Sequence, residues 1–362
     1  MKKFCINAPI NSVSFGQVSL GIIREMLDRG VEPNLFPIGG NTDLSSQDLP
    51  EKTLQKLSQL IDEARASHNK SDPAFKLWHF NGSQESFSKE QLLLTFYEAD
   101  QPTKEELNCF NSNRVLLSSK YSMKVFEDKG LKPEYLPLFF DHYNFSVKER
   151  KYFSDDRIVF NLCGKFENRK HHPRILDAWS RKYGNNNEYF LQCAIYNPFL
   201  SPEENDSVIH RSLRGEKYSN IQVLKPMAKN SLYNDFLNSG NIIIGMSGAE
   251  GWGLPEFHSI ALGKHSVILN AHSYKEFAND KNSVLVEPEG KMDIYDETFF
   301  KRGQRYNQGQ MFKWDEDDFI DGCEKAIERY KSNPVNEEGA KLKEEFHVSK
   351  TVDLLLEKIE GM

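Results

Sequence analysis

A glycine-rich segment in the second half of the chain carries the strongest chemical signal. Residues 247–254 read SGAEGWGL and lie between an apolar run typical of a strand (241–246) and a stretch typical of a helix (256–263). The free backbone N–H groups of such a turn and the positive helix end favour an anion. Glu250 stands in the turn, where its carboxylate can accept hydrogen bonds from sugar hydroxyls. On glycine spacing alone, a tight structural turn with a solvated glutamate explains the segment equally well.

Basic residues follow an earlier predicted strand. The sequence FNLCGKFENRKHH places Lys165 and Lys170 just beyond the strand that starts at Arg157, and Gly164 permits a close backbone approach. Two ammonium groups at the end of a strand suit a diphosphate, whose negative charge grows as the leaving group departs. An ordinary basic loop is the alternative interpretation.

Residues 247–263 as a whole resemble the donor-site motif of retaining family 4 glycosyltransferases, S-x-x-E-G-F-G-L-P-x-x-E-A-x-A-x-G. The positions in register are Ser247, Glu250, Gly251, Gly253, Leu254, Pro255, Ala261 and Gly263, with Trp252 in the aromatic place. The resemblance implies that Glu250 contacts the donor sugar. The second glutamate of the motif, which holds the nucleotide ribose, is replaced by His258. Either His258 bonds a hydroxyl itself or Glu256 substitutes for the missing carboxylate.

Further segments keep the chain order of this family. The run around Gly164 is similar to G-R-x-x-x-R-K-G, in which the first Arg and the Lys bind the diphosphate. Lys165 stands where the Arg would be, which keeps the charge but loses the bidentate fork. Glu276 falls at the glutamate that faces the nucleotide. The resemblance thus implies a donor-binding set of Gly16, Gly164, Ser247, Gly251, Trp252, Gly253, Leu254, His258 and Glu276.

The N-terminal half offers four weaker candidates. Gly16 follows the first predicted strand, where such enzymes bring backbone close to the donor; a plain turn glycine is the alternative. His79 ends the strand KLWHF and is a catalytic candidate beside Glu250, Lys165 and Lys170, although a lone histidine is more often structural. Glu98 and Asp100 end the run LLLTFYEAD and either face the acceptor or cap the next helix.

A separate acidic cluster, residues 315–318 (DEDD), contains the Asp-x-Asp spacing used by metal-dependent glycosyltransferases. It stands at a predicted helix start, where acidic side chains complement the helix dipole. We therefore interpret it as a helix cap and expect neither a metal nor another cofactor.

The elements around these residues alternate. Short apolar runs typical of strands are separated by helical stretches in 1–150 and again in 151–335, with a polar linker at 141–157. The pattern predicts an α/β fold of two Rossmann-like, doubly wound parallel sheets facing a cleft. The family resemblance implies that this is the GT-B fold, in which the first domain takes the acceptor and the second the nucleotide sugar. Residues 336–362 are predicted to form a helix that packs back on the first domain.

The composition excludes several classes of protein. The 362 residues carry a net charge of −7, which argues against affinity for a polyanion through bulk charge. The five cysteines form no Cys-x-x-Cys pair, so a reducing cytoplasm is expected. Without a long apolar run, integral membrane association is not expected.

The family resemblance implies a retaining, metal-independent glycosyltransferase (a hexosyl- or pentosyltransferase) that uses a nucleotide diphosphate sugar. The acceptor is an unidentified hydroxyl, with a glycan favoured and a modified DNA base not excluded. The alternative is a catalytically degenerate GT-B protein that binds a nucleotide sugar or glycan without turnover. The sequence identifies neither the donor base and sugar nor the oligomeric state.

Overall fold

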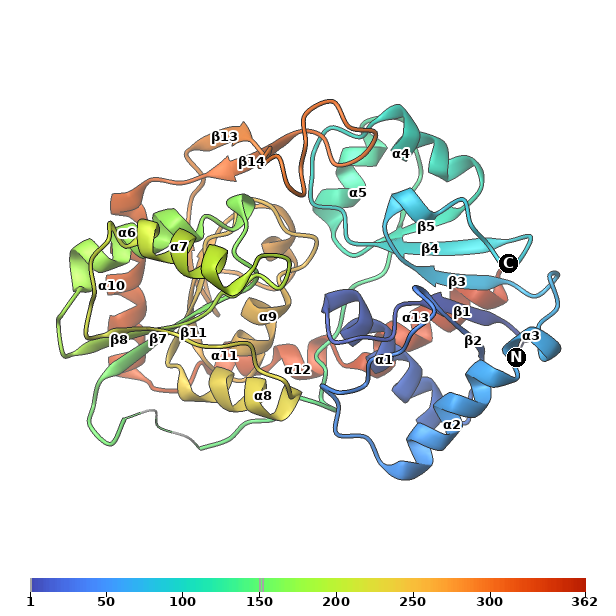
Figure 1. The fold of residues 1–362 in the computed structure, drawn as a ribbon, viewed down its shortest axis with the longest axis horizontal. Helices are drawn as coiled ribbons and strands as arrows, with labels where there is room; N and C mark the ends of the chain where they lie inside the picture. Colours follow the sequence, from blue (N-terminus) through green and yellow to red (C-terminus); the bar gives the residue numbers. More distant parts are fainter. Residues whose placement is uncertain (1, 150, 152) are drawn as a thin grey trace.

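The computed structural model describes residues 2–149, 151 and 153–362. It contains two six-stranded sheets, one in each half of the chain, and a small two-stranded sheet. The two large sheets lie side by side, each flanked by helices, and the last helix returns to the first half (Figure 1). Position 150, where the first domain is predicted to end, lies outside the described residues.

The N-terminal sheet is parallel throughout, with the strand order β2-β1-β3-β4-β5-β6. Its strands are β1 (Cys5–Ala8), β2 (Asn34–Pro37), β3 (Ala74–Leu77), β4 (Gln91–Thr95), β5 (Arg114–Leu117) and β6 (Glu134–Tyr135). Its helices are α1 (Ser14–Asp28), α2 (Glu51–Asp62), α3 (Ala64–Ser67), α4 (Lys104–Asn108) and α5 (Lys120–Glu127). The central strands β1, β3 and β4 are buried along their whole length, as continuous apolar runs in a covered parallel sheet should be.

The C-terminal sheet is also parallel, with the order β12-β11-β10-β7-β8-β9. Its strands are β7 (Ile158–Cys163), β8 (Tyr189–Ala194), β9 (Ile221–Val223), β10 (Ile242–Gly245), β11 (His265–Leu269) and β12 (Val284–Val286). Its helices are α6 (His172–Tyr183), α7 (Pro202–Ser212), α8 (Asn230–Ser239), α9 (Leu254–Ala261) and α10 (Glu316–Ser332). Because β7 and β10 are neighbours, the segments that follow them meet at one sheet edge. The predicted pair of doubly wound sheets is confirmed.

The C-terminal segment crosses back to the first half, as predicted, but in three pieces: α11 (Glu337–Ala340), α12 (Leu342–Glu345) and α13 (Val348–Glu360). Helix α13 packs against α1, and Asp353 forms an ion pair with Arg29 at 2.5 Å. Between α12 and α13 the chain runs beside residues 139–145, called the crossover segment below, which lead from the first half to the second. There the Phe140 N–H donates to the Phe346 carbonyl at 2.8 Å. This pairing with a neighbouring segment replaces one turn of the expected continuous helix.

Two elements were not predicted from the sequence. Helix α7 begins with a capping box, in which the Ser201 side chain and Glu204 satisfy each other's backbone N–H groups. The second is a hairpin of β13 (Gly290–Asp293) and β14 (Gln310–Lys313), whose connecting loop reaches the first half of the chain. There the Thr103 hydroxyl donates to the Arg305 carbonyl at 2.5 Å.

The acidic cluster at 315–318 is a helix start, as predicted. The Asp315 carboxylate accepts hydrogen bonds from the backbone N–H groups of Asp317 and Asp318 and so caps α10. Among the described residues, no helix has both the length and the apolar character needed to cross a membrane.

Candidate active site

A cluster of buried charges lies where β7 and β10 end. The Lys170 ammonium contacts the Glu250 carboxylate, and the Arg169 guanidinium approaches the same oxygen at 3.0 Å. Arg169 also donates to the Ala249 carbonyl at 2.7 Å, which fixes the turn that carries Glu250. Burial alone would raise the pKa of Glu250, but the charges of Arg169 and Lys170 outweigh it and hold that pKa well below its usual range. Glu250 is therefore a permanently ionised carboxylate.

Arg169 is the hub of this cluster. Its guanidinium pairs with Glu98 at 2.9 Å and with Glu167 at 3.0 Å, and its side chain is only 6% exposed. Glu98 follows β4, so this contact joins the two halves of the molecule. Burial raises the pKa of Glu98 to about 7, against the lowering effect of Arg169. The Arg169–Lys170–Glu250 group, with Glu98 and Glu167 around it, is called the charged centre below.

Lys165 lies at the edge of the charged centre, where it pairs with Glu167 and not with Glu250. Its ammonium is 2.8 Å from Glu167 and 5.2 Å from the ring centroids of both Phe199 and Phe299. With 40% of its side chain exposed, it lies at the solvent side of the charged centre. Gly164 has φ +101°, and a Cβ there would lie 3.0 Å from Cε of Lys170. This glycine therefore leaves room for the Lys170 side chain.

The glycine-rich turn is shaped by contacts from both halves. The Ser247 hydroxyl donates to the Arg169 carbonyl at 3.2 Å, and the Ser118 hydroxyl donates to the Gly251 carbonyl at 2.7 Å. A Cβ on Gly251 would lie 2.6 Å from Cβ of Phe96, so only glycine permits this approach. Gly253 precedes α9 with φ +95°, a left-handed conformation that favours glycine. Both glycine positions thus have a steric reason.

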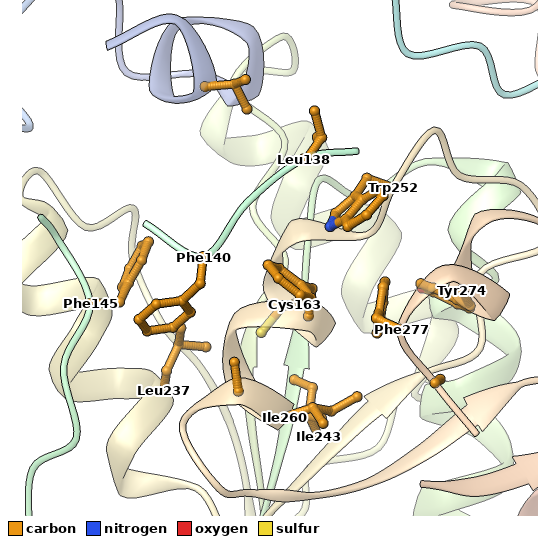
Figure 2. Packing of buried hydrophobic residues seen from close by; sticks show 14 of the residues in the cluster. Leu138, Phe140, Phe145, Cys163, Leu237, Ile243, Trp252, Ile260, Tyr274 and Phe277 are labelled. Atoms are coloured by element: carbon orange, nitrogen blue, oxygen red, sulfur yellow. The ribbon is translucent and has the colours of Figure 1, made fainter. Parts of the chain in front are cut away.

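Two residues of the predicted donor-binding set, Trp252 and Glu276, make contacts within the protein that leave their side chains engaged. Trp252 is buried and packs against Phe257, Phe277 and Phe346. Figure 2 shows Trp252 and Phe277 within the apolar cluster around α9. Glu276 accepts hydrogen bonds from the Lys120 N–H and the Tyr135 hydroxyl, each at 2.6 Å. Because Lys120 and Tyr135 belong to the first half, Glu276 ties the two halves together.

A cavity of about 400 Å³ lies beside this turn, at the boundary of the two halves. Leu254, the first residue of α9, belongs to its wall. The remaining wall combines residues 12–14, Gln17 and Ser46 of the first half with Tyr196, 224–227 and Asn230 of the second. Phe139, Asp141 and Phe145 of the crossover complete it. Its size and largely apolar wall are typical of a small-molecule site.

His258 lines this cavity, but the structure assigns its ring a different partner from the one expected. The Asp141 N–H donates to Nε2 of His258 at 3.3 Å, and the ring lies 4.4 Å from that of Phe145. Burial lowers the pKa of His258 to about 3, so the ring is neutral. The proposed substitute, Glu256, is not in the cavity wall: it lies on the sheet side of α9, where a Cβ on Gly245 would be 2.8 Å from its Cγ. Glu256 is therefore not placed to substitute for the missing carboxylate in this cavity, because residues two positions apart on a helix, such as Glu256 and His258, point to nearly opposite faces.

Gly16 and His79, two candidates from the N-terminal half, have different surroundings in the structure. Gly16 lies in the first turn of α1 instead of a loop, and a Cβ there would be 2.3 Å from the Asn11 carbonyl oxygen. His79 follows β3 and is exposed, with its ring 4.5 Å from that of Phe15. The surrounding protein, and then the Lys165 charge, lower the pKa of His79 to about 4. His79 of the first half is therefore within electrostatic range of Lys165 of the second half.

Glu98 and Asp100 have different surroundings despite their spacing. Glu98 reaches the charged centre, whereas Asp100 pairs with Lys291 at 2.6 Å and accepts the Gln310 N–H at 2.7 Å. The next helix is capped by Thr103 instead. The capping interpretation is therefore wrong for both, and Asp100 anchors the β13–β14 hairpin.

Sequence reasoning missed Arg169 and Glu167. Arg169 is adjacent to Lys170 and stands at the second Arg of the family motif, so the signal was present. Glu167 had no comparable signal, because its contact with Arg169 depends on the turn at Asn168–Lys170. Among the described residues, no group of three His, Cys, Asp or Glu side chains is arranged to hold a metal ion.

Comparison with known proteins identifies the fold. No model of a known protein family matches the chain, and no curated protein sequence matches it either. Similar solved structures include sucrose-phosphate synthase from Thermosynechococcus elongatus, with a TM-score of 0.68 and 11% identity over 99% of this chain and 98% of that one. HepE of Anabaena, solved in complex with UDP and glucose, has a TM-score of 0.65 and 12% identity over the full length of both chains. An α,α-trehalose 6-phosphate synthase from Burkholderia multivorans has a TM-score of 0.64 and 12% identity, covering 100% of this chain and 97% of that one. The protein therefore has the GT-B fold of these glycosyltransferases.

Proposed function

We propose that this protein transfers a sugar from a nucleotide diphosphate sugar to a hydroxyl group of an acceptor. One observation carries the proposal: two buried cations and an ionised carboxylate lie beside a cavity large enough for a nucleoside. Leu254 joins the two sites, because it lines the cavity and begins the helix that follows the Glu250 turn. The similar structures support a nucleotide sugar, since HepE was solved with UDP and glucose.

The charged centre suits the departure of a diphosphate. In the proposed reaction the bond between the anomeric carbon and the diphosphate oxygen breaks, and its electron pair goes to that oxygen. Arg169 and Lys170 stabilise the growing negative charge, which is the largest electrostatic demand of this step. Glu250, held in place by both cations, accepts hydrogen bonds from the donor sugar.

The acceptor hydroxyl then attacks the same face that the diphosphate leaves, and its proton passes to the departing oxygen. This course retains the anomeric configuration and requires neither a metal ion nor a resident cofactor. Contacts between the halves, such as Ser118 with Gly251, exclude water from the reacting centre. The acceptor approaches past His79 and Glu98, with Lys165 opposite.

A glycan is the favoured acceptor, because the net charge of −7 weighs against a polyanion such as DNA. The five cysteines are free and buried, which suits action in a reducing cytoplasm. Binding without turnover is the second candidate function. It is favoured by His258, whose Nε2 is occupied by the protein backbone where related enzymes present a carboxylate to ribose.

The test is direct. Calorimetry with UDP, GDP and ADP identifies the base, and release of the diphosphate from the matching glucose donor, with and without acceptors, measures turnover. We expect micromolar binding of one diphosphate and slow release without acceptor in the wild type. Lys217→Ala, an exposed site outside the cavity wall, serves as the control. Binding with no release under any acceptor supports the second candidate, and no binding of any diphosphate contradicts both.

Retention is tested on the product. With an α-linked donor, the new glycosidic bond should be α by NMR coupling constants. A β product would contradict front-face transfer while leaving the donor site intact.

A further inference from the structure

A group of amide side chains closes the cavity at the boundary of the two halves. Gln17 of α1 and Asn230 of α8 face each other there: Nδ2 of Asn230 donates to Oε1 of Gln17 at 2.9 Å, and Nε2 of Gln17 donates to Oδ1 of Asn230 at 3.2 Å. The Asn230 N–H also donates to the Ser46 carbonyl at 2.8 Å. Gln17, Asn230 and Ser46 all line the cavity. Its polar wall is therefore built from both halves.

Two other polar side chains of the wall, those of His258 and Asp141, are engaged by the protein. Nε2 of His258 accepts the Asp141 N–H. The Asp141 carboxylate accepts the Asn144 side-chain amide at 2.6 Å and the Tyr143 N–H at 3.2 Å. Both side chains thus hold the crossover segment in place. At these two positions a bound nucleoside would meet a histidine ring whose Nε2 is already engaged and a carboxylate that already holds residues 143 and 144.

The hydrogen-bonding capacity of the amide pair is uneven. Oε1 of Gln17 accepts from Gln47 at 2.7 Å and from Asn230, and its Nε2 contacts the Ser12 carbonyl, the Ser46 hydroxyl and Asn230. A side-chain amide offers two N–H donors and two lone pairs. Gln17 is therefore saturated. Within the described residues, the Asn230 side-chain amide donates one N–H to Gln17 and accepts one hydrogen bond from it. One N–H and one oxygen lone pair of this amide are therefore left for a ligand.

We infer that Asn230 hydrogen-bonds the ribose hydroxyls of the nucleoside in this cavity, and that Gln17 is a positioning residue that orients the Asn230 amide. A hydroxyl both donates and accepts, which matches the donor and acceptor that Asn230 retains. The inference rests on the proposed nucleotide-sugar site and adds to it the residue that binds the ribose. Because Gln17 and Asn230 belong to different halves, ribose recognition requires the halves to be closed on each other.

The experiment compares nucleotides by calorimetry on the full chain. The probes are UDP, 2′-deoxy-UDP and inorganic pyrophosphate, with the tightest of UDP, GDP and ADP and its deoxy analogue substituted if the wild type prefers another base. Asn230→Ala should weaken UDP binding about tenfold, the usual effect of losing such a bond, and leave pyrophosphate binding unchanged. The wild-type preference for UDP over 2′-deoxy-UDP should shrink in this variant.

Gln17→Ala should weaken UDP binding about three- to tenfold and add nothing in the Asn230→Ala background, because a positioning residue acts only through its partner. Ser231→Ala, the exposed neighbour on α8, is the matched control. Asn230→Leu, which is similar in size to asparagine but has no hydrogen-bonding group, replaces Asn230→Ala if the latter does not fold by circular dichroism, and should lose the same ribose preference.

Three outcomes overturn the inference: unchanged UDP affinity in Asn230→Ala, equal losses for UDP and pyrophosphate, or additive losses in the double variant. Failure of the proposed function looks different, because the wild type would then bind no nucleoside diphosphate.

Discussion

The charged centre and the cavity beside it are built on opposite physical principles. In the centre the buried Arg169 pairs with Glu167 and Glu250, and the buried Lys170 pairs with Glu250, so each charge is compensated by the protein. The cavity wall is largely apolar: Asp141 and Lys225 are its charged side chains, and Gln17 and Asn230 contribute neutral amides. In the proposed function, the charges of the centre stabilise the departing diphosphate, whereas the apolar groups and amides of the wall recognise the nucleoside by shape and hydrogen bonding. Changes in the centre should therefore affect turnover and stability, and changes in the wall should affect affinity.

The largest effect is expected at Lys170. Lys170→Met should reduce release of diphosphate from the donor by about a thousandfold, the upper range for removing one electrostatic contact to a developing charge. Steady-state assays measure this, with Lys217→Ala as control. A Lys170→Met enzyme within tenfold of wild type would show that the centre is structural and not catalytic.

Arg169 should dominate stability. Arg169→Met leaves Glu98, Glu167 and part of the Glu250 charge uncompensated, and breaking a buried pair costs about 3–5 kcal/mol. Urea unfolding at pH 7.5 measures the loss. Because Glu98 would then lack its partner, adding Glu98→Gln should recover part of it. If Arg169→Met unfolds like wild type, the cluster does not contribute as the geometry indicates.

Glu256 should make the stability of the protein depend on pH. Burial raises its pKa to about 7 in the folded protein, above the value of 4.5 for an exposed glutamate. The folded state then binds the proton more tightly than the unfolded state, so this contribution to stability is complete below pH 4.5 and is lost as the pH rises to about 7.

Glu256→Gln removes that dependence. The variant should gain on the order of 2–3 kcal/mol over wild type at pH 8, and the difference should shrink toward pH 4.5. Unfolding curves at both pH values measure it. A constant difference between the proteins at the two pH values would contradict a buried, titrating Glu256.

The smallest effect separates the two lysines. Lys165 is partly exposed and already paired with Glu167, so its charge is screened. Lys165→Ala should reduce turnover about tenfold or less, far below the loss in Lys170→Met. Equal losses would mean that Lys165 moves into the centre when the donor binds.

Local signals in the sequence predicted much of the site. Lys170 and Glu250 were each recognised as residues that follow a predicted strand, and the structure makes these strands neighbours, so that their turns meet and the two side chains pair. Gly253 was identified by its place in the family motif, and the structure adds the physical reason, a left-handed conformation directly before α9. The β13–β14 hairpin was missed because its strands carry a weak apolar pattern, with residues 291–293 exposed.

What the sequence determined by itself is the alternation of strands and helices and the residues of the turns that follow β7 and β10. Periodicity and turn chemistry are local, so the chain states them directly. Only the tertiary structure decided which side chains are free to act. Trp252, Glu276, Asp100 and His258 resemble site residues in the sequence, yet each contacts a distant segment: Phe346, Tyr135, Lys291 and Asp141. Such long-range contacts depend on how the two halves close, and no local pattern encodes that.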